Sequence, residues 1–256
     1  MTPNVRAVLP DATLEEARIR LDEWRISCLA VVEEVDDQYQ LQGVVTLTDL
    51  VRAGTLRSRP DRSAELLLPN APVTSIMTPD VIRVSGTDTL ATAARTMVER
   101  DVHRVFVEDR QAVQGVLSTR DVMRVLARDG VSAPIGNYMT TPVRAVHAKT
   151  TISAAMRIME EERISGIVVL ERGWPCGVFT HREILCSRHM PHDTLVGSVT
   201  NPAILVLPEG TPVHRAAANA ASVEVRRVIV SRQKAMVGIM SGLDFCRIAA
   251  LQTSVG

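Results

Sequence analysis

Four acidic residues occupy the same position in a motif that recurs along the chain, and they are the first candidates for ligand chemistry. Each stands six residues after a glycine and three residues after a serine or threonine. The acidic residues are Asp49, Asp121, Glu183 and Asp244, and the hydroxyl residues before them are Thr46, Ser118, Thr180 and Ser241. A carboxylate accepts two hydrogen bonds at once, which suits a ligand with two neighbouring hydroxyl groups. A carboxylate in the first turn of a helix is also favoured by the helix dipole without a ligand, and a hydroxyl there can cap the helix or bond a phosphate.

Two basic pairs are the second group of candidates, and they occur only in alternate copies of the motif. His103-Arg104 and Arg226-Arg227 each precede a short apolar run, whereas the other two copies have Ser27-Cys28 and Ser165-Gly166 at that position. Arginine offers a planar fork that binds two phosphate oxygens. A solvated basic pair at the start of a strand is the alternative. Recurrence in both even copies favours phosphate binding, with one basic cluster in each half of the chain.

These residues belong to a repeat that predicts one strand-helix-strand-strand-helix unit per copy. The motif glycines, Gly43, Gly115, Gly177 and Gly238, are 72, 62 and 61 residues apart. Each copy opens on a short apolar strand, and these strands are expected at 5–8, 81–84, 143–146 and 203–206. A threonine then caps the first helix, and the expected caps are Thr13, Thr89, Thr151 and Thr211. Thr13 and Glu16 have the spacing of a capping box, and Pro212 suits the first helical position.

The helices predicted by this repeat have one apolar face. Small apolar residues recur at spacings of three and four, as at Leu90, Ala93 and Met97, which is typical of a helix face that packs into a core. A single unit of this size cannot bury both faces of its small sheet, so the copies should pair.

The composition excludes several classes of protein. The 29 basic and 29 acidic residues cancel, and aromatic residues make up only 3% of the chain, which argues against a nucleic-acid binder. The longest apolar runs, such as 164–170, are too short to span a bilayer. The first residues lack the pattern of a secretory signal. We therefore expect a cytoplasmic protein with reduced cysteines and no membrane partner.

The repeat resembles the cystathionine-β-synthase (CBS) domain. The resemblance rests on Met-Thr-Pro at 77–79, Met-Thr-Thr-Pro at 139–142, the capping threonines and the four glycine-to-acid endings. Met1-Thr2-Pro3 matches as well, so we expect the native start to be complete. The resemblance implies an α/β (α+β) fold with CBS repeats at about 1–55, 72–129, 134–190 and 195–250. They would pair into two Bateman modules, 1–129 and 130–256. Four copies in one chain resemble stand-alone prokaryotic tandem-CBS proteins and the gamma subunit of AMP-activated protein kinase.

The resemblance also implies where a ligand would bind. Clefts between paired repeats would hold adenine nucleotides or related adenosyl compounds. Ribose contacts fall on Asp49, Asp121 and Asp244. Glu183 departs from the pattern because its extra methylene moves the carboxylate outward by about 1.5 Å. Phosphate contacts fall on His103, Arg104, Arg226 and Arg227, and the hydroxyls of the four motif residues either cap their helices, which is the favoured role, or bond a phosphate as well: Thr46, Ser118, Thr180 and Ser241. His103-Arg104 resembles the His-Arg pair of kinase gamma subunits, and Arg226 keeps the positive charge.

Other chemistry has little support in the sequence. Cys186, His189 and His192 have donor types that suit zinc, but no fourth ligand is near except His181. We therefore expect no metal. No GxSxG nucleophile elbow and no GxxxxGK[ST] phosphate loop is present, and the repeats leave no room for a catalytic domain. We do not expect an enzyme.

The sequence as a whole predicts a regulatory, ligand-sensing protein. It would bind AMP, ADP or ATP as a regulatory ligand, require no cofactor, form a homodimer and signal to another protein in trans. Two alternatives stay open, namely an interaction scaffold whose clefts are empty and a sensor of S-adenosylmethionine or NAD. The basic pairs would repel the positive sulfonium of S-adenosylmethionine, which favours the nucleotides.

Overall fold

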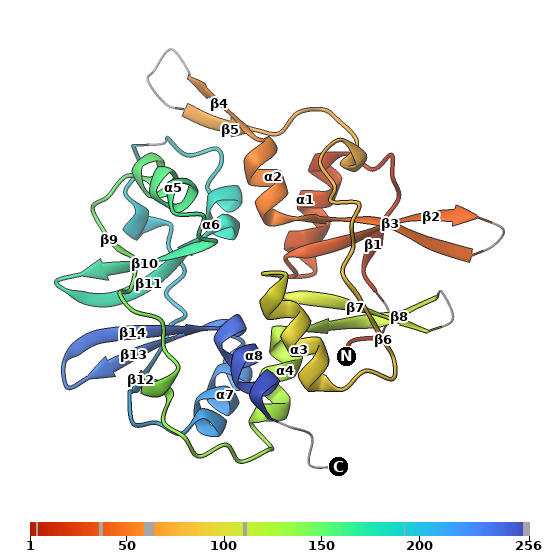
Figure 1. The fold of residues 1–256 in the computed structure, drawn as a ribbon. Helices are drawn as coiled ribbons and strands as arrows, with labels where there is room; N and C mark the ends of the chain where they lie inside the picture. The colour runs from red at the N-terminus through yellow and green to blue at the C-terminus, as the bar shows by residue number, and fades with distance from the viewer. Residues whose placement is uncertain (4, 36–37, 59–63, 110–111, 192, 253–256) are drawn as a thin grey trace. The chain divides into compact units, whose positions relative to one another are not determined.

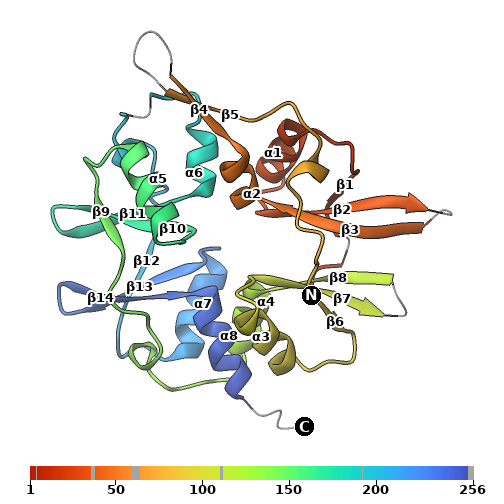
Figure 2. The same ribbon diagram turned by 45° about the horizontal axis from the view of Figure 1, so that its top comes forward.

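The computed structural model describes residues 1–3, 5–35, 38–58, 64–109, 112–191 and 193–252. It contains four copies of the predicted unit (Figure 1, Figure 2). Copy 1 consists of β1 (Ala7–Val8), α1 (Leu14–Glu23), β2 (Cys28–Val35), β3 (Gln38–Thr46) and α2 (Leu47–Ala53). Copy 2 consists of β6 (Arg83–Ser85), α3 (Leu90–Glu99), β7 (Arg104–Asp109), β8 (Ala112–Ser118) and α4 (Thr119–Leu126). Copy 3 consists of β9 (Ala145–His147), α5 (Ile152–Glu161), β10 (Gly166–Glu171), β11 (Trp174–Thr180) and α6 (His181–Cys186). Copy 4 consists of β12 (Leu205–Pro208), α7 (Val213–Ser222), β13 (Arg227–Arg232), β14 (Ala235–Ser241) and α8 (Gly242–Leu251). The α/β fold and the element order expected from the sequence are confirmed.

Each copy forms a three-stranded sheet of the same topology. The first strand lies parallel to the second, and the second pairs antiparallel with the third. The second strand of each copy has a register shift at the same place, after Val31, Val107, Val169 and Val230. The helix that follows the third strand therefore starts at an equivalent point in all four copies.

The glycine of the repeated motif allows a neighbouring segment to approach the third strand. The residue after it pairs with the Met-Thr-Pro segment or its counterpart, in the bridges Val44–Thr78, Val116–Thr2, Val178–Asn201 and Ile239–Thr140. A Cβ at Gly115 would lie 2.7 Å from the carbonyl oxygen of Thr2, and one at Gly177 would lie 2.5 Å from that of Asn201. The two halves of the sequence signature thus pack directly on each other.

The predicted helix caps are confirmed in three copies and wrong in the fourth. The hydroxyls of Thr13, Thr89 and Thr151 accept from a backbone amide of the first turn, and Thr13 completes its capping box with Glu16. In copy 4 the N-cap is Pro212, with ψ 142°, and the helix starts one residue later than expected. The reason is that Pro212 pairs as extended chain with Pro134, just as Thr13 pairs with Pro72. Thr211 therefore stands one residue outside the cap.

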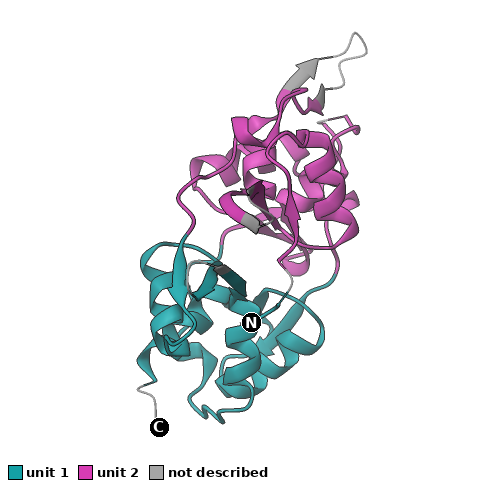
Figure 3. Ribbon diagram, turned by 90° about the vertical axis from the view of Figure 1, so that its right-hand side faces the viewer, with its two compact units in different colours: residues 1–4, 82–143, 203–256 teal, residues 5–81, 144–202 magenta. Residues whose placement is uncertain are grey.

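The chain forms two compact units, and neither is one half of the sequence (Figure 3). Unit 1 comprises residues 1–4, 82–143 and 203–256 and so contains copies 2 and 4. Unit 2 comprises residues 5–81 and 144–202 and contains copies 1 and 3. The modules 1–129 and 130–256 are thus not the compact units of the structure, and the sheet-mediated pairing of copies 1 with 2 and 3 with 4 stays a prediction.

Unit 1 has one core built from the helices of both its copies. Helix α8 packs against α3 and α4, and α4 packs against α7. Met97, Met123 and Phe245 are fully buried in this core. The alanine and methionine stripe of α3 faces it, as the spacing predicted.

Unit 2 has an equivalent core and one additional hairpin. Leu21, Met159 and Phe179 are buried in the core. The hairpin consists of β4 (Thr55–Ser58) and β5 (Ala64–Leu67) and lies between the first two predicted repeats, 1–55 and 72–129. Its Leu66 is 2% exposed and donates its amide to the carbonyl of Arg188 at 3.0 Å. The apolar run 66–68 was the sequence signal for this anchor.

Candidate functional site

The sheet register places the two basic pairs at equivalent points of copies 2 and 4. Arg104 opens β7 opposite Ser118, and Arg227 opens β13 opposite Ser241. In unit 2 the corresponding pairs are Cys28 opposite Thr46 and Gly166 opposite Thr180. Each arginine therefore stands beside the strand end from which a capped helix starts.

The basic pairs of copies 2 and 4 form one cluster inside unit 1. His103 is half-buried, and burial together with the charges of Arg227, Arg104 and Arg226 lowers its pKa to about 4. Asp101 acts in the opposite direction. Because arginines of both copies act on one imidazole, we name His103, Arg104, Arg226 and Arg227 the basic cluster of unit 1. The sequence analysis expected one such cluster in each half of the chain.

The first turns of helices α4 and α8 meet in unit 1. A Cβ on Gly242, the first residue of α8, would lie 2.4 Å from Oγ1 of Thr119, the first residue of α4. Next to Thr119, Arg120 crosses between the copies and donates from Nη2 to the carbonyl of Glu224 at 2.9 Å. Its Nε is buried and has no hydrogen-bond partner among the described residues. Glu224 lies two residues before Arg226 in the sequence. This hydrogen bond therefore connects the start of α4 to the segment that carries Arg226 and Arg227.

The motif carboxylates all fold back onto the hydroxyl residue three positions earlier. One oxygen of Asp49 accepts from the Thr46 amide at 2.8 Å and from its hydroxyl at 2.7 Å. The same pattern joins Asp121 to Ser118 and Asp244 to Ser241. The helix-capping interpretation of these residues is therefore present in the structure, and ligand contact would use the second oxygen.

The second carboxylate oxygen differs in its surroundings between Asp121 and Asp244. In Asp121 it accepts from the exposed Arg124 at 3.2 Å. In Asp244, which is 3% exposed, it accepts from Thr140 at 3.3 Å and forms an ion pair with Arg247. Asp244 is thus held by the fold more completely than Asp121.

Glu183 caps its helix in the same way as the aspartates. Its Oε2 accepts from the Thr180 amide at 2.9 Å and from the Thr180 hydroxyl. The extra methylene is accommodated, since the residue is 8% exposed and lies within the fold.

The starts of the second helices also meet in unit 2, which has Ser27-Cys28 and Ser165-Gly166 at the positions of the basic cluster of unit 1. Thr48 and His181, at the starts of α2 and α6, share a hydrogen bond of 3.0 Å between Oγ1 and Nδ1. Arg182 donates to the carbonyl of Ile26 at 2.7 Å and pairs with Asp22 at 3.2 Å. Arg182 thus crosses from copy 3 to copy 1 as Arg120 crosses from copy 2 to copy 4.

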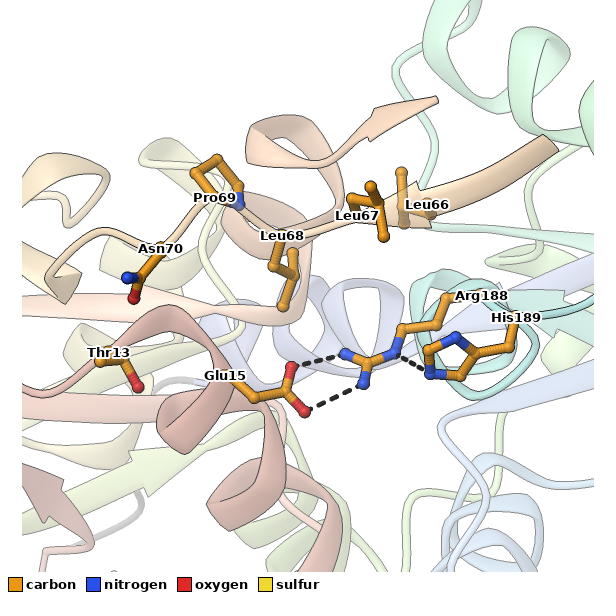
Figure 4. Close-up of a pocket in the computed structure, with 9 residues that line it drawn as sticks. All are labelled: Thr13, Glu15, Leu66, Leu67, Leu68, Pro69, Asn70, Arg188 and His189. Atoms are coloured by element: carbon orange, nitrogen blue, oxygen red, sulfur yellow. Dashed lines mark hydrogen bonds and ion pairs between the residues drawn. The ribbon is translucent and has the colours of Figure 1, made fainter. Parts of the chain in front are cut away.

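A small pocket lies in unit 2 between α1, the end of β5 and the segment after α6 (Figure 4). Two nitrogens of Arg188 donate to the Glu15 carboxylate, at 2.6 and 2.9 Å. The Nε of Arg188 donates to Nε2 of His189 at 2.9 Å. The hydrogen bond from Arg188 is the main reason why the pKa of Glu15 falls to about 2. Sequence analysis did not single out this charge pair, because its partners are 173 residues apart.

The structure does not support the zinc motif that the sequence suggested around Cys186 and His189. His189 accepts from Arg188, and burial raises the pKa of the Cys186 thiol and so disfavours a thiolate. His192 lies outside the described residues. Across the ranges that the structure describes, no three His, Cys, Asp or Glu side chains gather as metal ligands would. Over those same ranges, no helix has the length and apolarity of a membrane span.

A family model for the CBS domain matches three stretches of the chain, residues 1–55, 73–128 and 135–188. The chain belongs to the CBS domain family. Copy 4 lies outside these matches, but its sheet topology, capped second helix and register shift are those of the other copies.

Two solved structures share the fold over almost the whole length of this CBS protein. Protein MJ1225 from Methanocaldococcus jannaschii, proposed to be an archaeal homologue of g-AMPK, has a TM-score of 0.80 at 17% identity, with 97% of both chains covered. An uncharacterized conserved protein from Pyrococcus horikoshii has a TM-score of 0.67 at 19% identity, again with 97% of both chains covered.

Curated relatives match shorter stretches. A 33.4 kDa protein of Thermofilum pendens is 28% identical over 126 residues, which span 44% of this chain and 42% of that protein. A 17.7 kDa protein of Acidianus ambivalens is 32% identical over 88 residues, which span 34% of this chain and 54% of that protein. The chain thus covers about half the length of these relatives.

Proposed function

We propose that this CBS protein is a regulatory sensor that binds adenine nucleotides, and that the basic cluster of unit 1 holds their phosphate groups. The observation that carries the proposal is that Arg104 and Arg227 open equivalent strands of one compact unit, whose two copies Arg120 connects through the carbonyl of Glu224. The positive charges of these residues would attract a bound anion. Arginine also presents the fork that phosphate oxygens accept from.

The ribose would lie against the motif carboxylates in this proposal. Within unit 1, Asp121 is the better candidate, because its second oxygen accepts only from the exposed Arg124, whereas that of Asp244 is held by Thr140 and Arg247. The hydroxyls of Thr46, Ser118, Thr180 and Ser241 already donate to these carboxylates. Their oxygens could still accept from a ligand, but phosphate oxygens would have to find other donors.

Such a sensor has to act on a second protein. The sensor itself would do so as a homodimer or as a monomer. A ligand shifts the equilibrium between two conformations of the sensor only if it binds one of them more tightly than the other. The alternatives are a sensor of S-adenosylmethionine or NAD and a scaffold that binds no small molecule. The three arginines disfavour a positive sulfonium, so S-adenosylmethionine ranks below the nucleotides.

Calorimetric titration with ATP, ADP, AMP, adenosine, NAD and S-adenosylmethionine tests the proposal. Arg104→Ala and Arg227→Ala should each weaken ATP binding by roughly 10- to 100-fold, since each removes a charge-assisted hydrogen bond, and should leave adenosine binding nearly unchanged. Arg104→Lys should also weaken ATP binding, because a point charge cannot reproduce the fork. Arg128→Ala, which removes an exposed charge of unit 1, is the matched control. The proposal is wrong if S-adenosylmethionine outcompetes ATP while Arg104→Ala changes neither affinity.

A further inference from the structure

One wall of the pocket in unit 2 is the segment that follows the additional hairpin (Figure 4). Hydrogen bonds fix this segment at both ends. The amide of Leu66 donates to the carbonyl of Arg188 at 3.0 Å, and the carbonyl of Ala71 accepts from the amide of Leu14 at 3.1 Å. Residues 66–70 therefore line the pocket from fixed positions, and they belong to the insertion between the first two repeats rather than to the CBS repeat itself.

The walls of this pocket differ in their chemistry. The wall of residues 66–69 is apolar, with the sequence Leu-Leu-Leu-Pro, and it ends on the amide side chain of Asn70. The opposite wall carries the guanidinium of Arg188, whose side chain is 14% exposed. The volume is about 230 Å³, which is below the roughly 300–1,000 Å³ of sites for drug-sized ligands. The pocket therefore suits a small molecule that has both a polar and an apolar part.

The charged groups of the pocket have donors to spare but no acceptors. Arg188 donates to both oxygens of Glu15 at 2.6 and 2.9 Å, and Arg18 donates to the same oxygens at 2.8 to 3.2 Å. A carboxylate has about four acceptor positions, so these contacts use its capacity. The hydrogen bonds of Arg188 to Glu15 and His189 do not use all the N–H groups of the guanidinium. A ligand at this place therefore has to accept hydrogen bonds.

The charge of the same group also favours an anion. Two guanidiniums, those of Arg18 and Arg188, meet one carboxylate, which leaves one net positive charge. Asp22 acts on Arg18 as well, but it forms its own ion pair with Arg182 at 3.2 Å. Glu15 stays ionised near neutral pH, because the hydrogen bond from Arg188 lowers its pKa to about 2. A bound monoanion would balance the remaining charge.

The corresponding place in unit 1 has different chemistry. His214 has the position of Glu15, two residues after the helix N-cap, and Leu126 has the position of Arg188, five residues after the motif carboxylate. His214 donates from Nδ1 to the carbonyl of Val131 at 2.9 Å. The charged pocket is thus particular to unit 2 and is not a product of the repeat.

We propose that the pocket of unit 2 binds a small monocarboxylate with an apolar body. The carboxylate of the ligand would accept from Arg188 and Asn70, and its apolar body would lie against Leu67 and Leu68. An arginine binds phosphate as readily as carboxylate, but a phosphate ion would leave the leucines in contact with water. The site does not involve the basic cluster of unit 1, so this proposal and the nucleotide sensor can fail separately.

The experiment is a ligand-observed NMR titration of the full chain at about pH 7, where carboxylic acids are ionised. The probes are 3-methylbutanoate, acetate, 3-methylbutanamide and inorganic phosphate. We expect a Kd of about 1 mM for 3-methylbutanoate, which is reasonable for a ligand of about seven non-hydrogen atoms. Acetate lacks the apolar body and the amide lacks the charge, so each should bind about tenfold more weakly or worse.

Two substitutions with opposite expected effects test the role of the charges. Arg188→Ala should weaken 3-methylbutanoate binding by roughly 10- to 100-fold, and it keeps the hairpin anchor, because Leu66 bonds to the backbone of Arg188. Glu15→Gln removes the competing carboxylate and should strengthen binding by roughly two- to fivefold, which a merely disrupted pocket would not do. Arg157→Ala, which removes an arginine of unit 2 with a 71% exposed side chain, is the matched control.

Several results would overturn the proposal. They are an amide that binds as tightly as 3-methylbutanoate, a phosphate ion that binds more tightly, an affinity that Arg188→Ala leaves unchanged, and weaker binding in Glu15→Gln. Absence of binding at about 20 mM 3-methylbutanoate would also overturn it. ATP titration of Arg188→Ala separates this site from the proposed function, because the affinity for ATP should equal that of the unmodified chain.

Discussion

The chemistry of this CBS protein depends on a few charged side chains whose neighbours come from distant parts of the chain. Asp244 shows this most clearly, because its carboxylate is buried between Ser241, Thr140 and Arg247. Asp49 has the same motif position but makes its cap with Thr46 at a half-exposed site. A shared motif position therefore does not imply a shared energetic role.

At the residue scale, Asp244→Ala should destabilise the protein more than Asp49→Ala. Loss of the buried Asp244 carboxylate removes a cap and leaves the part-buried Ser241 and Thr140 donors without their acceptor, which costs about 2 kcal/mol, whereas loss of a half-exposed cap costs about 1 kcal/mol. Urea denaturation of the two variants measures the difference. Equal losses would show that burial of Asp244 adds nothing to its capping role.

The low pKa of His103 predicts how stability depends on pH. The folded pKa of about 4 lies below the ordinary value of 6.5, so the unfolded chain binds more protons between these two values. The free energy of unfolding therefore falls as the pH drops from about 6.5 to 4, by at most about 3 kcal/mol from this residue. His103→Asn should flatten that pH dependence in denaturation experiments, and an unchanged slope would contradict the assignment.

At the element scale, the capped second helices of copies 2 and 4 start against each other. Gly242 leaves room for Thr119, because a side chain there would overlap its hydroxyl and Cβ at 2.4 and 2.7 Å. The other three copies have leucine, threonine or histidine at the position of Gly242. The glycine thus belongs to this particular contact rather than to the repeated motif.

Gly242→Ala should therefore destabilise unit 1. The added methyl group forces the first turns of α4 and α8 apart, and overpacking of this kind costs roughly 1–3 kcal/mol. Gly210→Ala is the matched control in the same unit, since a Cβ there meets nothing within 4 Å. The midpoint of chemical denaturation measures both variants, and equal midpoints would show that the helix starts can separate freely.

At the scale of the whole molecule, each compact unit combines two copies that are far apart in the sequence. The cores of copies 2 and 4 and of copies 1 and 3 are closed by helices. The N-terminal segment adds to this interleaving, because Thr2 pairs with Val116 of copy 2 at 2.8 and 3.1 Å. A cut after residue 129 would leave each unit with only one of its two copies.

A fragment of residues 1–129 should consequently form a dimer. The helices of copies 1 and 2 would lose the partners that cover Leu21 and Met97 in the full chain, and a second fragment is the available cover for that apolar surface. Sedimentation equilibrium of the fragment, with the full chain as control, measures its assembly. A folded monomeric fragment would show that copies 1 and 2 are a self-sufficient module.

The sequence by itself determined the local structure and the family. Strand and helix order, the caps at Thr13, Thr89 and Thr151, and the capped helix after each glycine strand all follow from residues within one copy. Such features depend on contacts between residues a few positions apart, which a spacing pattern records directly. Pro212 was missed because its extended conformation depends on Pro134, 78 positions away in the chain.

Only the tertiary structure decided which copies share a core and which charges meet. The four repeats have nearly interchangeable apolar faces, so hydrophobic pattern alone cannot say whether copy 2 packs with copy 1 or with copy 4. The helix contacts of unit 1 show that copies 2 and 4 share a core, and within that unit the charges of Arg226 and Arg227 act on His103. Burial and electrostatic repulsion depend on distance in space rather than along the chain, which is why the basic residues were visible in the sequence and their shared cluster was not.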